Sequence, residues 1–357
     1  MTEVQTQFFT KTSDAWQAML GDVESASASI DIEQYIFTID LIGQQFIDLL
    51  IQKAKAGLRI RLLCDTVGSW SFYRSPLPEQ LRSVGIHVKF FNPVKPWRIT
   101  NFTANFFRDH RKIMIIDDHI AHLGGVGIKN DMADWRDTHM RVTGLLVPDI
   151  MRSFEIIWRS MIRSKRARFT PSPQFVKNFN VLTNSPRPGQ RFIYQALISQ
   201  IRNAKKYIYL TTPYFIPDIR LFRILRLAAK RGVDVRIMVP EIADHYFINH
   251  ARESYFTLAL KAGIRIRVYK GVMMHAKSAV IDDEWATTGS FNLDSLSFYF
   301  NHEINIAASD PAFVAQVKQH FFEDIQLSRE VQYEQWIHRP LRKKFLELLT
   351  WPFHSIM

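Results

Sequence analysis

The sequence predicts an α/β protein made of two similar halves, each a mainly parallel sheet flanked by helices, packed together with pseudo-two-fold symmetry. Strand-like and helix-like segments alternate along the 357 residues, and their order repeats after about half of the chain. A short motif, His-x-Lys-x₄-Asp, also occurs once in each half. With 47% hydrophobic residues, the chain can fill a globular core.

The alternating segments are similar in type and order in the two halves. In the first half we assign a strand, a helix that closes at Gly57 and a second strand to residues 29–37, 41–57 and 58–65. In the second half the same order recurs in residues 206–215, 219–232 and 233–241. A helix running into a further strand follows in each half, at residues 77–93 and 255–271. This order is typical of a sheet covered by helices.

Composition shifts divide the chain into four parts. We expect an N-terminal half (1–162), a basic linker with prolines (163–191), a C-terminal half (192–328) and a basic amphipathic tail (329–357). The first residues lack the pattern of a signal peptide, and no run of 18 apolar residues occurs, so we expect any membrane contact to be peripheral. The single cysteine, Cys64, excludes an intrachain disulfide and a cysteine metal cluster.

The repeated motif is the strongest functional signal in the sequence. Its residues are His110, Lys112 and Asp117 in the first half and His275, Lys277 and Asp282 in the second. With average composition, about 0.04 chance matches would be expected from the twelve histidines. Because residues two apart on a strand point to the same face, each histidine should project together with its lysine.

The similarity continues after each motif. Gly124-Gly125 in the first half correspond to Gly289-Ser290 in the second, where Asn292 follows. A strand-like segment then carries an acid in each half, Asp137 and Glu303. We expect Ser290 and Asn292 to add hydrogen bonds, and each acid to accept a hydrogen bond from the far nitrogen of a motif histidine and fix its tautomer.

These residue types suit phosphodiester transfer without a metal. One neutral imidazole can attack phosphorus, the other can protonate the leaving oxygen, and the two lysines can hold the non-bridging oxygens. We assign Asp117 and Asp282, at the ends of their strands, a structural or supporting role. Because a lysine beside each histidine repels a divalent ion, we expect neither a metal nor a cofactor. The other histidines are interpreted as core or surface residues: His119, His122, His139, His245, His250 and His302.

The constellation resembles the phospholipase D superfamily over almost the whole chain. The segments DHRKIMIID, WRDTHMRV, TTPYFIP and GSFNLD, with the Gly-Gly pair, resemble bacterial cardiolipin synthases of a short form without N-terminal membrane spans. One departure is Gly127, where the family pattern usually has Asn. The resemblance implies that His110 is the nucleophile and His275 the acid and base. It also implies transfer of a phosphatidyl group from phosphatidylglycerol to another phospholipid.

The net charge of +12 favours an anionic partner, either a membrane or a nucleic acid. Aromatic residues lie among basic ones in residues 335–357 and 95–110, which suits a bilayer interface, a docked terminal helix or base stacking. The resemblance favours phospholipid substrates and a peripheral place on the cytoplasmic face of the cell membrane over nucleic acid. A phospholipase D hydrolase, a nuclease and a non-catalytic lipid-binding scaffold remain alternatives, and the oligomeric state is open.

Overall fold

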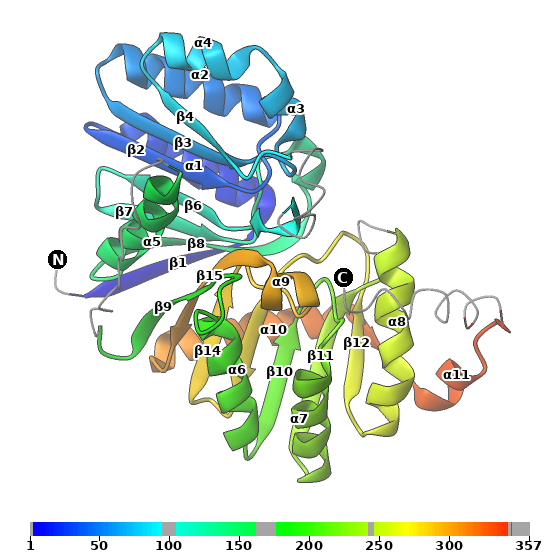
Figure 1. Ribbon diagram of the computed structural model, residues 1–357. Coiled ribbons are helices and arrows are strands. Elements are labelled where there is room, and N and C mark those ends of the chain that lie inside the picture. Colours follow the sequence, from blue (N-terminus) through cyan, green and yellow to red (C-terminus); the bar gives the residue numbers. More distant parts are fainter. Residues whose placement is uncertain (1–2, 95–104, 162–175, 242–245, 342–343, 345–357) are drawn as a thin grey trace.

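The computed structural model describes residues 3–94, 105–161, 176–241, 246–341 and 344. Figure 1 shows two α/β halves, one above the other, each built around its own β-sheet. The predicted class, an α/β protein with two phospholipase D-like halves, is confirmed.

The first half forms a seven-stranded sheet in the order β1-β8-β7-β6-β2-β3-β4. Its strands are β1 (Val4–Lys11), β2 (Ser29–Gln34), β3 (Arg59–Asp65), β4 (His87–Phe91), β6 (Lys112–Ile116), β7 (Ile120–Gly124) and β8 (Arg136–Gly144). Its helices are α1 (Thr12–Ser25), α2 (Leu41–Lys55), α3 (Trp70–Arg74), α4 (Leu77–Ser83) and α5 (Val147–Ser160). The short 3₁₀ helix η2 (Asn130–Met132) precedes β8.

The second half forms a sheet in the order β16-β12-β11-β10-β13-β14-β15-β5, with β9 also paired to β15. Its strands are β9 (Phe179–Asn184), β10 (Tyr207–Thr211), β11 (Asp234–Pro240), β12 (Arg265–Tyr269), β13 (Ser278–Ile281), β14 (Trp285–Gly289), β15 (Asn301–Ala308) and β16 (Ser328–Glu330). Its helices are α6 (Phe192–Asn203), α7 (Ile219–Lys230), α8 (Tyr246–Lys261), α9 (Ser295–Tyr299), α10 (Pro311–Gln326) and α11 (Tyr333–Ile337).

The sheets are mixed, so the expectation of mainly parallel sheets was wrong. Among the described strands, only β2-β3-β4 and β10-β11-β12 run parallel within their own half, and β6-β7-β8 and β13-β14-β15 run antiparallel. One cause lies at the end of each motif, where Asp117-Asp118 and Asp282-Asp283 adopt positive φ between 50° and 59° and join β6 to β7 and β13 to β14. These residues make tight turns, and a tight turn joins antiparallel strands because a parallel pair needs a long crossover.

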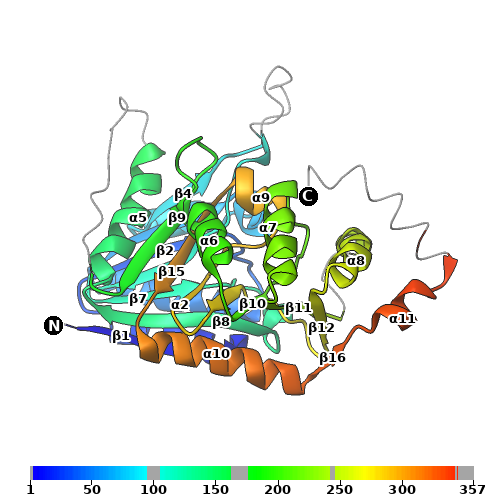
Figure 2. The same cartoon turned by 90° about the horizontal axis from the view of Figure 1, so that it is seen from below.

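The halves share strands and a core. The strand β5 (Arg108–Asp109), which directly precedes the first motif, pairs with β15 of the second sheet. Residues 179–184, expected in the linker, form β9 and belong to the second sheet. One apolar cluster joins α5 and the first sheet to α10 and the second sheet, through residues such as Ile113, Phe154 and Ile304. Figure 2 shows α10 and β1 at the same edge of the molecule.

Two stretches considered for membrane contact lie largely outside the described residues. These are most of residues 95–110 and most of the tail. The basic linker segment 163–175 lies outside the described residues as well. In the described part of the tail, Trp336 of α11 packs against Phe256 of α8, with ring centroids 5.2 Å apart. None of the helices in the described part of the chain is both long enough and apolar enough to cross a membrane.

Candidate active site

The two motif histidines lie where the halves meet, and each is held by the backbone of the opposite half. The amide of His110 donates to the carbonyl of His302, at 3.0 Å, and the amide of His275 donates to the carbonyl of Arg136, at 2.7 Å. Each accepting residue directly precedes one of the two acids that the sequence singled out, Glu303 or Asp137. Backbone pairing therefore sets both acids beside histidines of the other half.

The side chains complete this crosswise arrangement. The Nδ1 atom of His110 lies 2.9 and 3.0 Å from the two carboxylate oxygens of Glu303, and Nδ1 of His275 lies 2.7 Å from Oδ2 of Asp137. Glu303 and Asp137 are almost fully buried, and the two histidines are 8% and 7% exposed. The contact at Nδ1 fixes the orientation of each imidazole, so Nε2 is the ring nitrogen that can act on a substrate.

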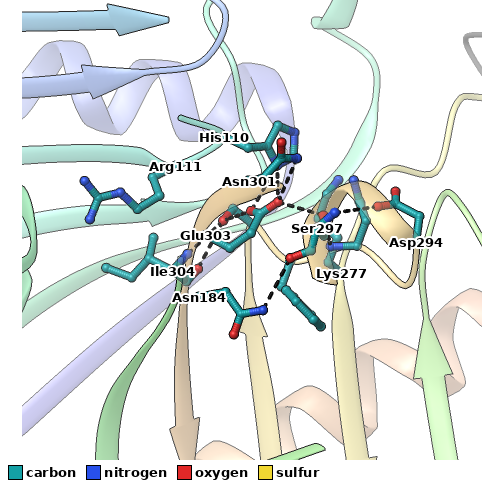
Figure 3. Close-up of polar contacts among 12 residues, drawn as sticks. His110, Arg111, Asn184, Lys277, Asp294, Ser297, Asn301, Glu303 and Ile304 are labelled. Carbon is teal, nitrogen blue, oxygen red and sulfur yellow. Dashed lines mark hydrogen bonds and ion pairs between the residues drawn. The ribbon is translucent and has the colours of Figure 1, made fainter. Parts of the chain in front are cut away.

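The two carboxylates accept different numbers of hydrogen bonds, and Figure 3 shows the polar contacts around one of them, Glu303. Besides His110, Glu303 accepts from the hydroxyl of Ser290, from the hydroxyl of Ser297 at 2.7 Å and from the amide of Asn301 at 3.4 Å. Burial alone would raise the pKa of Glu303, but His110, Lys112 and Ser290 together hold it below its usual value. Among the described residues, Asp137 accepts only from His275 and from the Thr138 amide, at 2.7 Å.

Burial also decides the charge state of His110. Removal from water lowers the pKa of His110 to about 4, and the attraction of Glu303 only partly opposes this effect. The neighbouring cations Lys112 and Lys277 lower that pKa further. The ring of Tyr35 lies edge-on, with its centroid 4.8 Å from the centroid of the His110 ring. His110 is therefore a neutral imidazole near pH 7, as a nucleophile must be.

Both motif lysines are buried beside their histidines. The Nζ atom of Lys112 donates to the carbonyl of His110 at 2.6 Å, and Nζ of Lys277 donates to the carbonyl of His275. Burial lowers the pKa of Lys112 to about 7, and the nearby Glu303 opposes that shift. Two lysine side chains buried beside the paired histidines suit an anionic ligand such as a phosphodiester.

The motif aspartates are separate from these groups. Asp117 accepts hydrogen bonds from the backbone amides of residues 27–29, at 2.7–2.8 Å, and Asp282 accepts from those of residues 205–207, at 2.6–2.9 Å. These amides lie at or just before the first residues of β2 and β10. Each aspartate thus ties the turn after its motif to the start of the neighbouring strand and lies away from the histidine pair.

Ser290 and Asn292 lie at the site, and the first half offers no amide equivalent to Asn292. The Oδ1 atom of Asn292 is buried without a hydrogen-bond partner in the described structure, while the backbone amide donates to the Ser297 hydroxyl at 3.2 Å. At Gly127, an added Cβ would lie 3.2 Å from Cβ of Ile36 and 3.4 Å from Sδ of Met132. Apolar packing therefore replaces a polar side chain on that side.

Several residues at the site were missed from the sequence. Trp135 packs on His275 with ring centroids 5.2 Å apart, and Ser297 and Asn301 bond Glu303. Strand periodicity could have found two of them, because Trp135 and Asn301 each lie two residues before an acid and so share its face. Ser297 lies on α9, a helix capped by Asp294, whose pKa burial raises to about 7. Of the histidines interpreted as core or surface residues, His122 is buried, and its Nε2 atom lies 2.6 Å from Oδ2 of Asp22.

The crossed His–carboxylate pairs between two repeated halves define a phosphodiester-transfer protein of the phospholipase D class. Residues 19–140 and 197–325 match the family described as "Cardiolipin synthase, PLD-like domain". The major cardiolipin synthase of Bacillus subtilis is 36% identical over 92% of this chain and 70% of its own length. The chain belongs to the cardiolipin synthase family of phospholipase D-like enzymes, and it is a phosphatidyltransferase.

Two further comparisons agree in sequence and in fold. A cardiolipin synthase of Geobacillus kaustophilus is 32% identical over 97% of this chain and 71% of its own length. The crystal structure of a phosphatidylserine synthase from Haemophilus influenzae superposes with a TM-score of 0.77, covering 99% of this chain and 93% of that one. At 15% identity, this second likeness supports the fold alone.

Proposed function

We propose that this enzyme makes cardiolipin by transferring a phosphatidyl group from phosphatidylglycerol to the hydroxyl of a second phosphatidylglycerol. The observation that carries the mechanism is the crossed pair of contacts, His110 with Glu303 and His275 with Asp137. Two imidazoles fixed at Nδ1 and facing one site can divide the work of nucleophile and acid. The choice of lipid rests on the names of the relatives.

In the first step, Nε2 of His110 attacks phosphorus while the bond to the glycerol oxygen breaks. Protonated His275 gives its proton to that oxygen, and glycerol leaves. In the second step, the hydroxyl of the incoming phospholipid attacks phosphorus and gives its proton to His275, and the phosphorus–nitrogen bond breaks. Lys112 and Lys277 hold the non-bridging oxygens through both transition states, and Asn292 offers its amide to the same group.

We assign the nucleophile to His110 because burial lowers its pKa to about 4, which leaves it neutral in the resting enzyme. Family resemblance supports the same assignment. The substrate is a membrane lipid, so we place the protein peripherally on the cytoplasmic face of an anionic membrane. The formal charge of +12 supports that placement.

The test incubates purified protein with phosphatidylglycerol vesicles and resolves the products by mass. We expect cardiolipin and glycerol; phosphatidic acid would indicate a hydrolase, and no lipid product would leave the nuclease alternative. His110→Ala and His275→Ala should each abolish turnover, whereas His119→Ala, a matched change of an exposed histidine, should not. Exhaustive chelation should leave the rate unchanged, and loss with rescue by a divalent ion would contradict the metal-free mechanism.

A further inference from the structure

Two exposed aliphatic side chains occupy equivalent places in the two halves. Leu41 is the first residue of α2 and Ile219 is the first residue of α7, and they are 75% and 89% exposed. Each follows an aspartate that caps its helix: Asp40 accepts from the amide of Gly43 at 3.2 Å, and Asp218 accepts from that of Leu221 at 2.7 Å. Because both helix starts are capped, the two exposed side chains are attached to well-ordered backbone.

Both positions are close in sequence to an aromatic residue at the catalytic centre. Leu41 follows Tyr35, whose ring packs on His110, and Ile219 follows Tyr214, whose ring centroid lies 6.4 Å from that of His275. The two helix starts also hold equivalent places in the repeat, because α2 follows β2 and α7 follows β10, and each of these strands begins the parallel part of its sheet.

Two more exposed aromatic residues extend this surface. Trp70, 52% exposed, begins α3, and the preceding Ser69 donates its hydroxyl to the Tyr35 carbonyl at 3.0 Å. Phe192, 47% exposed, begins α6, shortly after the end of β9 that pairs with Glu303. We call Leu41, Trp70, Phe192 and Ile219 the apolar rim. Large side chains exposed together around a site are typical of a binding surface.

The charges beside the apolar rim identify its partner. Exposed Arg74 lies with its guanidinium carbon 5.8 Å from the Trp70 ring, and exposed Arg220 follows Ile219 directly. The neighbouring carboxylate of Asp218 is occupied by the hydroxyls of Tyr194, at 2.6 Å, and Tyr299. Aliphatic and aromatic side chains flanked by guanidinium groups match the interface of an anionic bilayer, where acyl chains lie directly beneath phosphates.

We propose that the apolar rim docks the mouth of the active site onto an anionic lipid surface. This inference rests on the proposed lipid function, because the rim then meets the layer that holds the substrate. The reacting phosphodiester lies at headgroup depth. An enzyme seated by Leu41 on one side and Ile219 on the other can therefore reach it while the acyl chains stay in the bilayer.

The test compares Leu41→Ser/Ile219→Ser with Leu227→Ser, which changes a 43% exposed leucine at the opposite end of α7. Sedimentation with vesicles of phosphatidylglycerol and phosphatidylcholine gives the partition coefficient. Burying a leucine or isoleucine side chain strengthens partition by about tenfold or more, so the double variant should bind at least about a hundredfold more weakly. The Leu227→Ser variant should bind as the wild type does.

A second readout is the ratio of turnover on vesicles to turnover on dispersed short-chain phosphatidylglycerol, which should fall in the double variant alone. Unchanged vesicle binding in that variant would overturn the docking proposal and leave the proposed function intact. Wild-type dimers that dissociate in the double variant would instead assign the rim to a second copy of the chain. Rim-dependent vesicle binding without any lipid product would preserve the docking and refute the proposed function.

Discussion

The crossed acid–histidine contacts predict a large, specific effect of Glu303→Gln. The glutamine side chain has the same size, but it removes the charge and replaces one acceptor oxygen by a donor. Glu303 accepts from four side chains, so an amide leaves part of this set unpaired. An NH₂ group facing His110 also moves the imidazole proton to Nε2 and removes the attacking lone pair. By analogy with the orienting acid of a serine protease, we expect a loss of about 10⁴ in rate, or about 5 kcal/mol.

The assay measures cardiolipin formation and, by rapid quench, phosphohistidine at His110. Ser297→Ala is the matched control, because it removes one 2.7 Å hydrogen bond to Glu303 but keeps the charge. Losing one such bond to a charged group costs about 1.5–3 kcal/mol, so Ser297→Ala should slow the reaction by about 10- to 100-fold. If Glu303→Gln kept a tenth of wild-type activity, or if both variants lost equally, the orienting role would be refuted.

Three further predictions concern packing, turns and pH. Gly125→Ala should reduce turnover at least about 100-fold, because its Cβ would lie 2.1 Å from Oδ1 of Asp137 and displace that carboxylate; unchanged kinetics would contradict the contact. Asp117→Ala and Asp282→Ala should each lower the free energy of unfolding in urea by about 2–3 kcal/mol, with less loss for Asn, which tolerates positive φ. The pKa of the His110 imidazole is about 4 in the folded protein, whereas its ordinary value is 6.5. Between pH 4 and 6.5 the unfolded state therefore binds more protons than the folded state. Stability should therefore fall by up to about 3 kcal/mol from pH 6.5 to 4, and a flat profile in urea titrations would contradict it.

The repeated helices and strands were predicted well because the residue pattern that specifies each of them lies within the segment itself. The helix assigned to residues 41–57 is α2 (Leu41–Lys55), and the strand assigned to 58–65 is β3 (Arg59–Asp65). The direction of the strands after each motif was less accessible, because it depends on two aspartates at positive φ whose turn role is hidden inside a catalytic-looking motif. Their acceptor bonds to a neighbouring strand become visible only in three dimensions.

The sequence also could not show which acid forms a hydrogen bond with which histidine. Both acids follow a motif of their own half at almost the same distance, which suggests pairing within each half as readily as between halves. The actual pairs join residues 193 and 138 positions apart, because β5 pairs with β15 and Arg136 bridges Met274. These contacts depend on how the halves pack, and no local periodicity encodes that packing.

The asymmetry between the two motifs has a steric origin that links residues distant in sequence. In the second half, Ser290 has room for a hydroxyl that bonds the longer Glu303. In the first half, the carboxylate of Asp137 fills the space where a Cβ on Gly125 would lie, so glycine accompanies the shorter acid. Among the described residues, Asp137 consequently has fewer donors than Glu303, and its charge is less dispersed. A carboxylate with fewer donors stabilises an imidazolium more strongly, which suits His275 as the acid, while burial keeps His110 neutral for attack and the heavily bonded Glu303 only partly opposes this effect.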